Sequence, residues 1–457
     1  MSSASASNLT SGFIDLATYD EQEKYMYGGS NATAYFVRDT VKSTWFTQVP
    51  VVLSRNAGTP AFGQDWSVSI SRAGDYMLHA WLRVTFPEIT PVVTGDQGIR
   101  WTRNLMHNIV KECSITFNDL VAARLDSYHL DFWSAFTVPA GKRNGYANMI
   151  GSIDELIQPA ANGVPLPAVT LNLPIPLFFG RDSGVSLPTA ALPYNEMRIN
   201  FTFRDWTELL VLDDSSITGA VPSRVPTLAE VGGSAPTLGS VQVWANYAIV
   251  SNEERKRMGC APRDILIEQV QTAPKQTFSP ATNSAPSFDI RFSHAIKVVF
   301  FAARNTTVAS DWSNYTAAAA VPSAGSTSFN PSGGVDPILQ TSLVYENTNR
   351  LSSMGSDYFS LVNPWYHSPV IPMETGYHSY SYSLDYYNLD PMGSTNFGKL
   401  SNVSIAPEAS EGAILSANGT GAGSTGTDHV NTFDHITTVI NNNVIRISGG
   451  ALGFPVL

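Results

Sequence analysis

The chain has 457 residues, more than the roughly 250–300 residues that one hydrophobic core usually fills, so two domains are expected. Charged residues make up only 14% of it, while 34 Gly and 28 Pro favour many short strands joined by turns. A net charge of −11, with no run of Lys or Arg, argues against direct nucleic-acid binding.

The first half is predicted to be strand-rich after an N-terminal arm and lead-in, residues 1–56. Residues 66–70 open it with Trp66, Val68 and Ile70 on one face, and residues 76–86 alternate apolar and other side chains over a long strand. Residues 169–177 form another strand, in which Pro174 and Pro176 predict an edge or a bulge because Pro cannot donate to a ladder. Strands are also predicted over residues 197–203 and 241–249.

Helices are predicted to be short insertions between the strands. The best candidates are residues 126–136 and 152–157, the second with Ser152 and Glu155 spaced as a capping box. Ser251 and Glu254 have the same spacing at the start of a charged segment. Residues 253–264 are therefore predicted to link a first domain, residues 57–252, to a second, residues 265–457.

The second half repeats the strand pattern. Ile265 and Ile267 enter it, residues 288–298 are predicted to form one strand, and residues 439–447 form the last. Residues 377–405 predict a strand, a tight turn and a strand, since His378, Tyr380 and Tyr382 alternate with Ser before Pro and Gly break the pattern. The Tyr stripe could stack sugars or bases, but packing against a partner strand is favoured.

Long turn-rich connections occupy residues 212–239, 308–334 and 406–427. Connections of this length are typical of functional surfaces or of segments covered in an assembly. Two strand-rich halves with long loops favour an all-β double jelly roll, two eight-stranded antiparallel sandwiches, over an up-and-down barrel with short hairpins.

Catalytic and cofactor motifs are weak throughout the chain. The segment 421–426 has the G-x-G-x-x-G spacing but lies in a Gly/Ser/Thr tract rather than between a strand and a helix, so a flexible loop is favoured. Ser183, beside Asp182, lacks a nucleophile elbow, and His367, His378, His429 and His435 lack a spaced third metal ligand. We therefore predict no catalytic residue, no metal and no cofactor.

Cysteine usage and the N-terminus predict a soluble chain without a disulfide framework. Cys113 and Cys260 are the only cysteines and are expected to be buried free thiols. No signal peptide and no stretch of about 20 apolar residues is present.

Several segments together resemble the major capsid proteins of large icosahedral double-stranded DNA viruses, most closely those of iridoviruses. These segments span nearly the whole chain: residues 11–20 (SGFIDLATYD), 101–110 (WTRNLMHNIV), 145–151 (GYANMIG), 176–196 (PLFFGRDSGVSLPTAALPYNE), 342–348 (SLVYENT), 391–397 (PMGSTNF) and 453–457 (GFPVL). The turn formed by Pro391, Gly393, Ser394, Asn396 and Phe397 is taken as the structural signature of the family.

The resemblance implies a structural role in the virion. Three chains would form a pseudo-hexagonal capsomer that tiles the outer capsid shell, assembled in the host cytoplasm. One end would face minor capsid and penton proteins and an internal membrane, with the arm, residues 1–42, on that inner side. The alternative from the fold alone is a carbohydrate-binding β-sandwich, because jelly rolls also serve as lectins.

Overall fold

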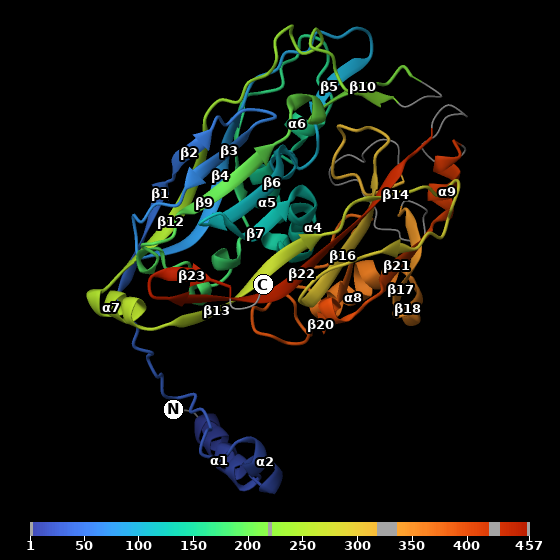
Figure 1. Ribbon diagram of the computed structural model, residues 1–457. Coiled ribbons are helices and arrows are strands. Elements are labelled where there is room, and N and C mark those ends of the chain that lie inside the picture. Colours follow the sequence, from blue (N-terminus) through green and yellow to red (C-terminus); the bar gives the residue numbers. More distant parts are fainter. Residues whose placement is uncertain (1–2, 218–221, 318–335, 420–429, 455–457) are drawn as a thin grey trace. The chain divides into compact units, whose positions relative to one another are not determined.

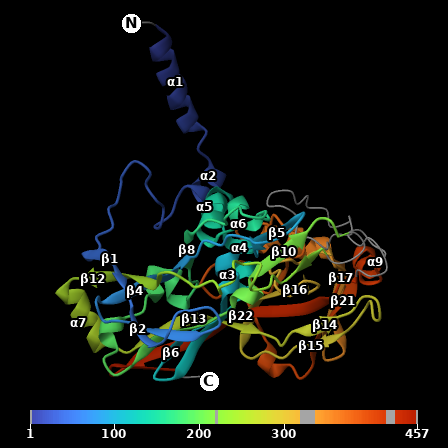
Figure 2. The same cartoon turned by 90° about the horizontal axis from the view of Figure 1, so that it is seen from above.

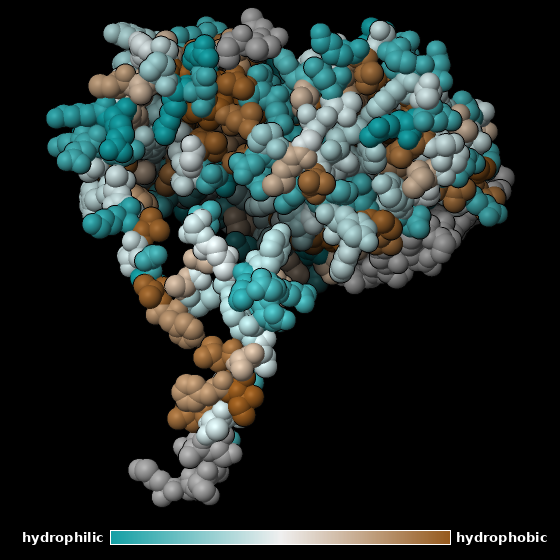
Figure 3. Space-filling view, turned by 90° about the horizontal axis from the view of Figure 1, so that it is seen from below, coloured by the Kyte–Doolittle hydropathy of each residue, from teal (hydrophilic) through white to brown (hydrophobic). Residues whose placement is uncertain are grey.

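The computed structural model describes residues 3–217, 222–317, 336–419 and 430–454. The chain forms two compact units, Met1–Trp45 and Phe46–Leu457. The first unit contains helices α1 (Ser3–Ala17) and α2 (Glu21–Met26), and Asp20 begins α2 with a capping box to Glu23. Leu9, Phe13 and Leu16 follow helical spacing on α1 and are 66%, 68% and 73% exposed. Figure 3 shows the apolar character of this unit in brown.

Two antiparallel sheets enclose the core of the first half (Figure 1). One has the order β1-β12-β4-β8 and the other β2-β3-β9-β6-β7, and Leu82 and Ile199, one from each sheet, are fully buried between them. A small third sheet has the order β11-β10-β5. The strands are β1 (Phe46–Val52), β2 (Ser54–Gly58), β3 (Asp65–Ser69), β4 (Tyr76–Phe86), β5 (Gln97–Trp101), β6 (Val110–Phe117), β7 (Leu120–Asp126), β8 (Val169–Pro174), β9 (Met197–Phe203), β10 (Leu210–Asp214), β11 (Ser223–Arg224) and β12 (Val241–Val250).

Two further antiparallel sheets form the second half, around a core that includes Phe301 and Ile405. Their orders are β13-β22-β16-β19 and β15-β21-β17-β18, with β14 and β23 paired to β22 and β20 paired to β16. The strands are β13 (Arg263–Thr272), β14 (Gln276–Phe278), β15 (Phe288–Asp289), β16 (Ala295–Asn305), β17 (Ile338–Tyr345), β18 (Thr348–Gly355), β19 (His378–Ser381), β20 (Thr395–Asn396), β21 (Val403–Ala409), β22 (Phe433–Ser448) and β23 (Ala451–Gly453).

The helices of the second unit are short, and α4 lies between the two halves in both Figure 1 and Figure 2. They are α3 (Leu105–Ile109), α4 (Ser127–Thr137), α5 (Ala140–Ile150), α6 (Asp154–Ile157), α7 (Asn252–Cys260), α8 (Asn363–His367) and α9 (Glu411–Ala417). Single 3-10 turns cover Phe178–Gly180, Ser183–Val185, Thr189–Ala191, Trp206–Glu208 and Phe397–Lys399, and a π-helical turn covers Tyr358–Val362. Among the described residues, none of the helices combines the length and the apolar character needed to cross a membrane.

The strongest strand predictions are confirmed. Residues 76–86 form β4, and residues 197–203 form β9, whose side chains alternate strictly between buried and half-buried. The edge prediction for residues 169–177 is also confirmed, since β8 ends its sheet and pairs only with β4, with Pro174 opposite Trp81. Pro fits there because its missing N–H removes no bond on the open side of an edge strand.

The predicted hairpin over residues 377–405 is wrong. β19 and β20 both pair with β16, whereas β21 pairs with β15 and β17 in the other sheet. The alternation of Tyr and Ser predicted a strand with the Tyr face buried and the Ser face exposed to solvent. Instead, Ser379 and Ser381 are buried, and Leu384 is 73% exposed. Strand pairing depends on which long strand offers an open edge, and here that strand is β16.

The single strand predicted over residues 288–298 is also wrong. The chain breaks at His294, whose φ is 66°, so that β15 and β16 belong to different sheets. β16 continues to Asn305, and nearly all of its residues are buried. A strand covered on both faces shows a continuous apolar run instead of alternation, which explains why the pattern underestimated its length.

Several local predictions also fail. In the described structure, the Ser251 side chain makes no capping bond at α7, and α6 follows Ile153 rather than Ser152. Cys113 is buried as expected, but Cys260 is exposed at the end of α7. The connection predicted over residues 406–427 contains the end of β21 and all of α9. Parts of the connections 212–239, 308–334 and 406–427 lie outside the described residues.

Candidate functional site

The candidate site is the junction where α4, a helix of the first half, covers the outer face of the sheet β13-β22-β16-β19. Phe132 and Phe136 of α4 stack on Phe300 of β16, with ring centroids 5.7 and 5.3 Å apart. Tyr386 meets the same ring edge-on at 5.8 Å. Asp126 fixes the start of α4 by accepting a bond from the His129 N–H at 2.8 Å. The two halves therefore share an apolar layer in addition to their separate cores.

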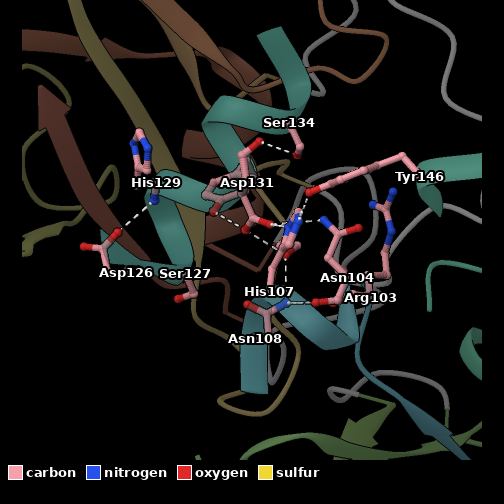
Figure 4. Close-up of polar contacts among 12 residues, drawn as sticks. Arg103, Asn104, His107, Asn108, Asp126, Ser127, His129, Asp131, Ser134 and Tyr146 are labelled. Carbon is pink, nitrogen blue, oxygen red and sulfur yellow. Dashed lines mark hydrogen bonds and ion pairs between the residues drawn. The ribbon is translucent and has the colours of Figure 1, made fainter. Parts of the chain in front are cut away.

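A single buried carboxylate, Asp131 of α4, binds donors from both halves (Figure 4). His107 Nδ1 of α3 donates to it at 2.8 Å, since a carboxylate can only accept. The second half contributes the hydroxyls of Ser313, at 2.8 Å, and Tyr315, at 2.9 Å. Hydrogen bonds to a buried charge are stronger than neutral ones, so Asp131 stabilises the contact between the halves.

The phenols around Asp131 stay protonated. Tyr146 lies 2.6 Å from His107 Nε2, and its pKa is raised by burial and by the charge of Asp131. Tyr315 is completely enclosed, and burial, followed by the charge of Asp131, raises its pKa well above the ordinary value. These hydroxyls therefore remain hydrogen-bond donors or acceptors across the physiological pH range, and none is poised to transfer a proton.

Buried arginines form further links between the halves. Arg100 of the first half bonds Asp213 at 2.5 Å and Asp311 of the second half at 3.2 Å. Burial alone would lower the pKa of Arg100, but the charges of Asp311 and Asp213 outweigh it and raise the pKa. Arg103 reaches Glu374 in the same way.

Trp312 lies between two arginines, one from each half. The guanidinium carbons of Arg204 and Arg304 are 3.7 and 3.6 Å from the centre of its rings. The indole N–H donates to the Glu208 carbonyl at 2.8 Å. Cation–π contacts are strongest where water is excluded, and Trp312 is 9% exposed. This stack therefore joins the halves near the start of α4, where Tyr128 also packs against Trp312.

A third charged cluster centres on Glu268 of β13. Lys297 of β16 donates to it at 2.5 Å, and Arg181 of the first half forms an ion pair with it. Burial, together with the charge of Arg181, lowers the pKa of Lys297 to about 8. Lys297 also donates to the Asn388 carbonyl at 2.7 Å. Relative domain motion is the usual expectation for a small interface, whereas these clusters hold the two halves as one block.

The arrangement that most resembles a catalytic triad is Ser356, His378 and Asp336. Ser356 Oγ and Asp336 Oδ2 lie 2.6 and 2.9 Å from the same nitrogen, His378 Nε2. A proton relay needs the nucleophile and the acid on opposite nitrogens of the imidazole. The three side chains are also buried, so no substrate can reach them, and the cluster is a structural one.

Within the described part of the chain, the other residues considered as nucleophile or metal ligands are not brought together into one site. Ser183 begins a tight turn, and His367 Nδ1 lies 2.9 Å from the Leu384 carbonyl oxygen. His435 stacks on Phe288 at 4.9 Å, and burial with the nearby His378 lowers its pKa to about 3. His429 and the segment 421–426 lie outside the described residues. Within those residues, no group of three His, Cys, Asp or Glu side chains could hold a metal ion.

The predicted signature turn forms a corner between β19 and β21. Gly393 has φ 118°, and a Cβ there would lie 2.9 Å from the Tyr382 carbonyl oxygen. The Asn396 side chain accepts from the Gly398 N–H at 2.9 Å, and Phe397 is buried against Tyr382. Pro391 and Ser394 are exposed.

Sequence reasoning missed the junction. Its carboxylates and arginines come from distant segments, such as Arg100 and Asp311, and no short motif connects them. Lys297 is the one residue of the junction that the local sequence could have indicated, because it is a single charge inside the apolar run AIKVVFF. A buried Lys requires a partner, but the pattern could not name Glu268.

Comparisons with known proteins cover nearly the whole chain. The family described as "Major capsid protein N-terminus" matches residues 34–250, and the family described as "Large eukaryotic DNA virus major capsid protein" matches residues 254–453. The major capsid protein of Wiseana iridescent virus is 64% identical, over 98% of this chain and 94% of the relative. That of Invertebrate iridescent virus 6 is 61% identical over the full length of both.

Solved structures show the same fold at low identity. The PBCV-1 VP54 capsid protein has a TM-score of 0.73 at 19% identity, covering 93% of this chain and all of the other. The Faustovirus major capsid protein has a TM-score of 0.67 at 12% identity, covering 92% and 93% of the two chains.

Proposed function

The chain belongs to the major capsid protein family of large eukaryotic DNA viruses, whose curated iridovirus members share 44–64% identity with it, and from this premise we propose that three copies associate into a pseudo-hexagonal capsomer. Each copy contributes two sandwiches to a ring of six. Capsomers of this kind tile the facets of an icosahedral shell. A head-to-tail contact between copies closes into such a ring when its rotation matches three-fold symmetry.

The observation that carries the proposal is the rigid junction between the halves. In a capsid lattice each copy contacts its neighbours through both sandwiches, so the two sandwiches must keep a fixed orientation relative to each other. The aromatic stack of α4, the Asp131 network and the three charged clusters provide that relation. Removing one partner from a buried ion pair typically destabilises a protein by about 3–5 kcal/mol, so the junction opposes hinge motion.

We propose that each half is an eight-stranded jelly roll. When β2, the small sheet β11-β10-β5 and the strands β14, β20 and β23 are set aside, the strands of each half can be numbered one to eight in chain order. Both halves then contain one sheet with the order 1-8-3-6 and one with the order 2-7-4-5. This repeated order supports a duplicated sandwich. The first jelly roll then begins at β1, inside the range 1–56 predicted as arm and lead-in, and α7 overlaps the predicted linker 253–264 but begins one residue before it.

We also propose that the outer ends of the sandwiches face the exterior. The inner ends then face minor capsid and penton proteins and the internal membrane, in particles assembled in the host cytoplasm. The arm, residues 1–42, belongs on the inner side in this arrangement. The exposed apolar side chains of α1 support a covered position, since solvent-exposed apolar faces of this size mark interaction sites. No direct contact with nucleic acid is part of the proposal.

Light scattering after size exclusion tests the assembly. The purified chain, of 49.4 kDa, is expected to elute as a species of three times that mass across a dilution series. Obligate interfaces commonly bury more than about 2,000 Å², so the trimer should persist at low micromolar concentration. A monomer at every concentration would contradict the proposal. The carbohydrate-binding alternative predicts instead a monomer that is retained on immobilised glycans.

A further inference from the structure

An exposed aromatic knob projects from the second half. It consists of Val362, Trp365, Tyr366 and Leu384, which are 42%, 70%, 73% and 73% exposed. Of the eight Trp residues within Phe46–Leu457, all of which lie in the described part of the chain, Trp365 is the only exposed one. Monomeric proteins rarely expose contiguous apolar groups of this size unless they bind a partner.

The knob is held rigidly by the junction. His367 Nδ1 lies 2.9 Å from the Leu384 carbonyl oxygen, which ties α8 to the other part of the knob. Ser368 Oγ donates to the Phe136 carbonyl of α4 at 2.7 Å and accepts from the Tyr386 hydroxyl at 2.8 Å. Because these bonds position the helix before any partner arrives, binding would require little ordering of the chain.

A groove in the first half has complementary character. Its volume is about 1060 Å³, and it lies between α4, α5 and the edge strand β8. Its apolar lining includes Trp81, Trp133, Tyr146, Met149 and Ile175. Pro174 and Pro176 lie on its β8 side, where they remove ladder donors, so an added strand cannot pair along the length of this edge. The groove is therefore suited to binding apolar side chains of a partner, and not to pairing with a strand of that partner.

Charge distinguishes the two surfaces. Lys142 supplies the positive charge of the groove lining that has no ion pair among the described residues, since Arg181 is already paired with Glu268. Asp357 precedes the turn that leads into α8, and Asp385 follows Leu384 in the knob. An acidic, aromatic knob and a basic, apolar groove form a complementary pair. Tyr387, three residues beyond Leu384, lines the groove, so the two surfaces adjoin on one side of the molecule.

We infer that Trp365 and Tyr366 of one copy enter the groove of the next copy in the trimer. The inference rests on the proposed trimer and identifies the surfaces that make it. A head-to-tail ring requires two different, complementary surfaces on the same molecule, because each copy uses its knob toward one neighbour and its groove toward the other. Large aromatic side chains at the centre of an interface are also the usual anchors of binding energy.

Cross-linking between differently tagged copies tests this contact directly. One chain carries Met149→Cys and the other Tyr366→Cys, both with Cys260→Ser, and the two are co-expressed. Mild oxidation is expected to give a covalent species containing both tags on a non-reducing gel, since only two separate copies can form that bond. The matched control replaces Tyr366→Cys by Tyr194→Cys, which is 75% exposed outside the knob, and should give none.

Removal of the knob gives a second readout. The double variant Trp365→Ala, Tyr366→Ala is expected to weaken trimer association by about 30-fold or more per contact, the effect of losing a hot spot, while Tyr194→Ala leaves it unchanged. Circular dichroism checks that both variants are folded. A trimer that forms normally without cross-linking, and that tolerates the double variant, would overturn this contact but leave the trimer proposal intact. Failure of the unmodified chain to form a trimer would overturn both.

Discussion

At the scale of single residues, the buried histidines make stability depend on pH. His435 is 3% exposed, and its Nε2 has no hydrogen-bond partner among the described residues. Burial, followed by the charge of His378, lowers its pKa to about 3, against about 6.5 in the unfolded chain. Between these two values the unfolded state binds one more proton than the folded state, so folding becomes less favourable as the pH falls.

We therefore predict that the free energy of unfolding falls from pH 6.5 downward. His435 contributes up to about 1.4 kcal/mol per pH unit in this window, and His129, whose pKa burial also lowers to about 3, contributes similarly. His435→Gln should reduce the slope without abolishing it. Urea unfolding at pH 7, 6 and 5, at one protein concentration, measures this slope. Phe36→Ala, which removes a fully exposed side chain that does not titrate, serves as the control and should keep the original slope.

At the scale of elements, β16 and α4 determine how the halves join. β16 is buried on one face by the core of its own sandwich and on the other by α4. Its run AIKVVFFAARN has the composition of a central strand, and its length is explained only by this double coverage. The hairpin predicted over residues 377–405 fails for the related reason that β16 supplies the pairing edge for β19.

Phe300→Ala is expected to destabilise the chain by about 3–5 kcal/mol, because it removes a buried ring that contacts Phe132, Phe136 and Tyr386. Denaturant unfolding measures the loss. Phe36→Ala is the matched control, since this ring is fully exposed and its removal should change the free energy of unfolding by no more than about 0.5 kcal/mol. Equal effects of the two substitutions would show that α4 does not stabilise the junction.

At the scale of the whole molecule, the proposed inner location of the arm can be measured in assembled particles. A protease-cleavable tag joined to residue 1 should resist protease in intact particles and be cleaved once they are disrupted. A tag inserted between the exposed Gly233 and Ser234, in the long connection 212–239, is the comparison, and it is expected to be cleaved in intact particles. Cleavage of the N-terminal tag in intact particles would place the arm outside.

The family could be predicted from the sequence because the segments that carry the resemblance are continuous runs of residues. The resemblance rested on runs such as WTRNLMHNIV and PMGSTNF, and the full-length relatives confirm it. The family role of Pro391, Gly393, Ser394, Asn396 and Phe397 stays a prediction. Their geometry describes a corner of the fold and does not test what the family requires.

The sequence by itself determined the strand-rich class, the long strands β4 and β9, and the edge position of β8, because each depends on the period or the backbone chemistry of one short segment. Tertiary structure alone decided the junction. Arg100 meets Asp311, and Asp131 meets Tyr315, only after the two halves have folded against each other. A buried charge can be recognised locally, but its partner is chosen by the packing of distant elements, and that choice joins two sandwiches into one building block.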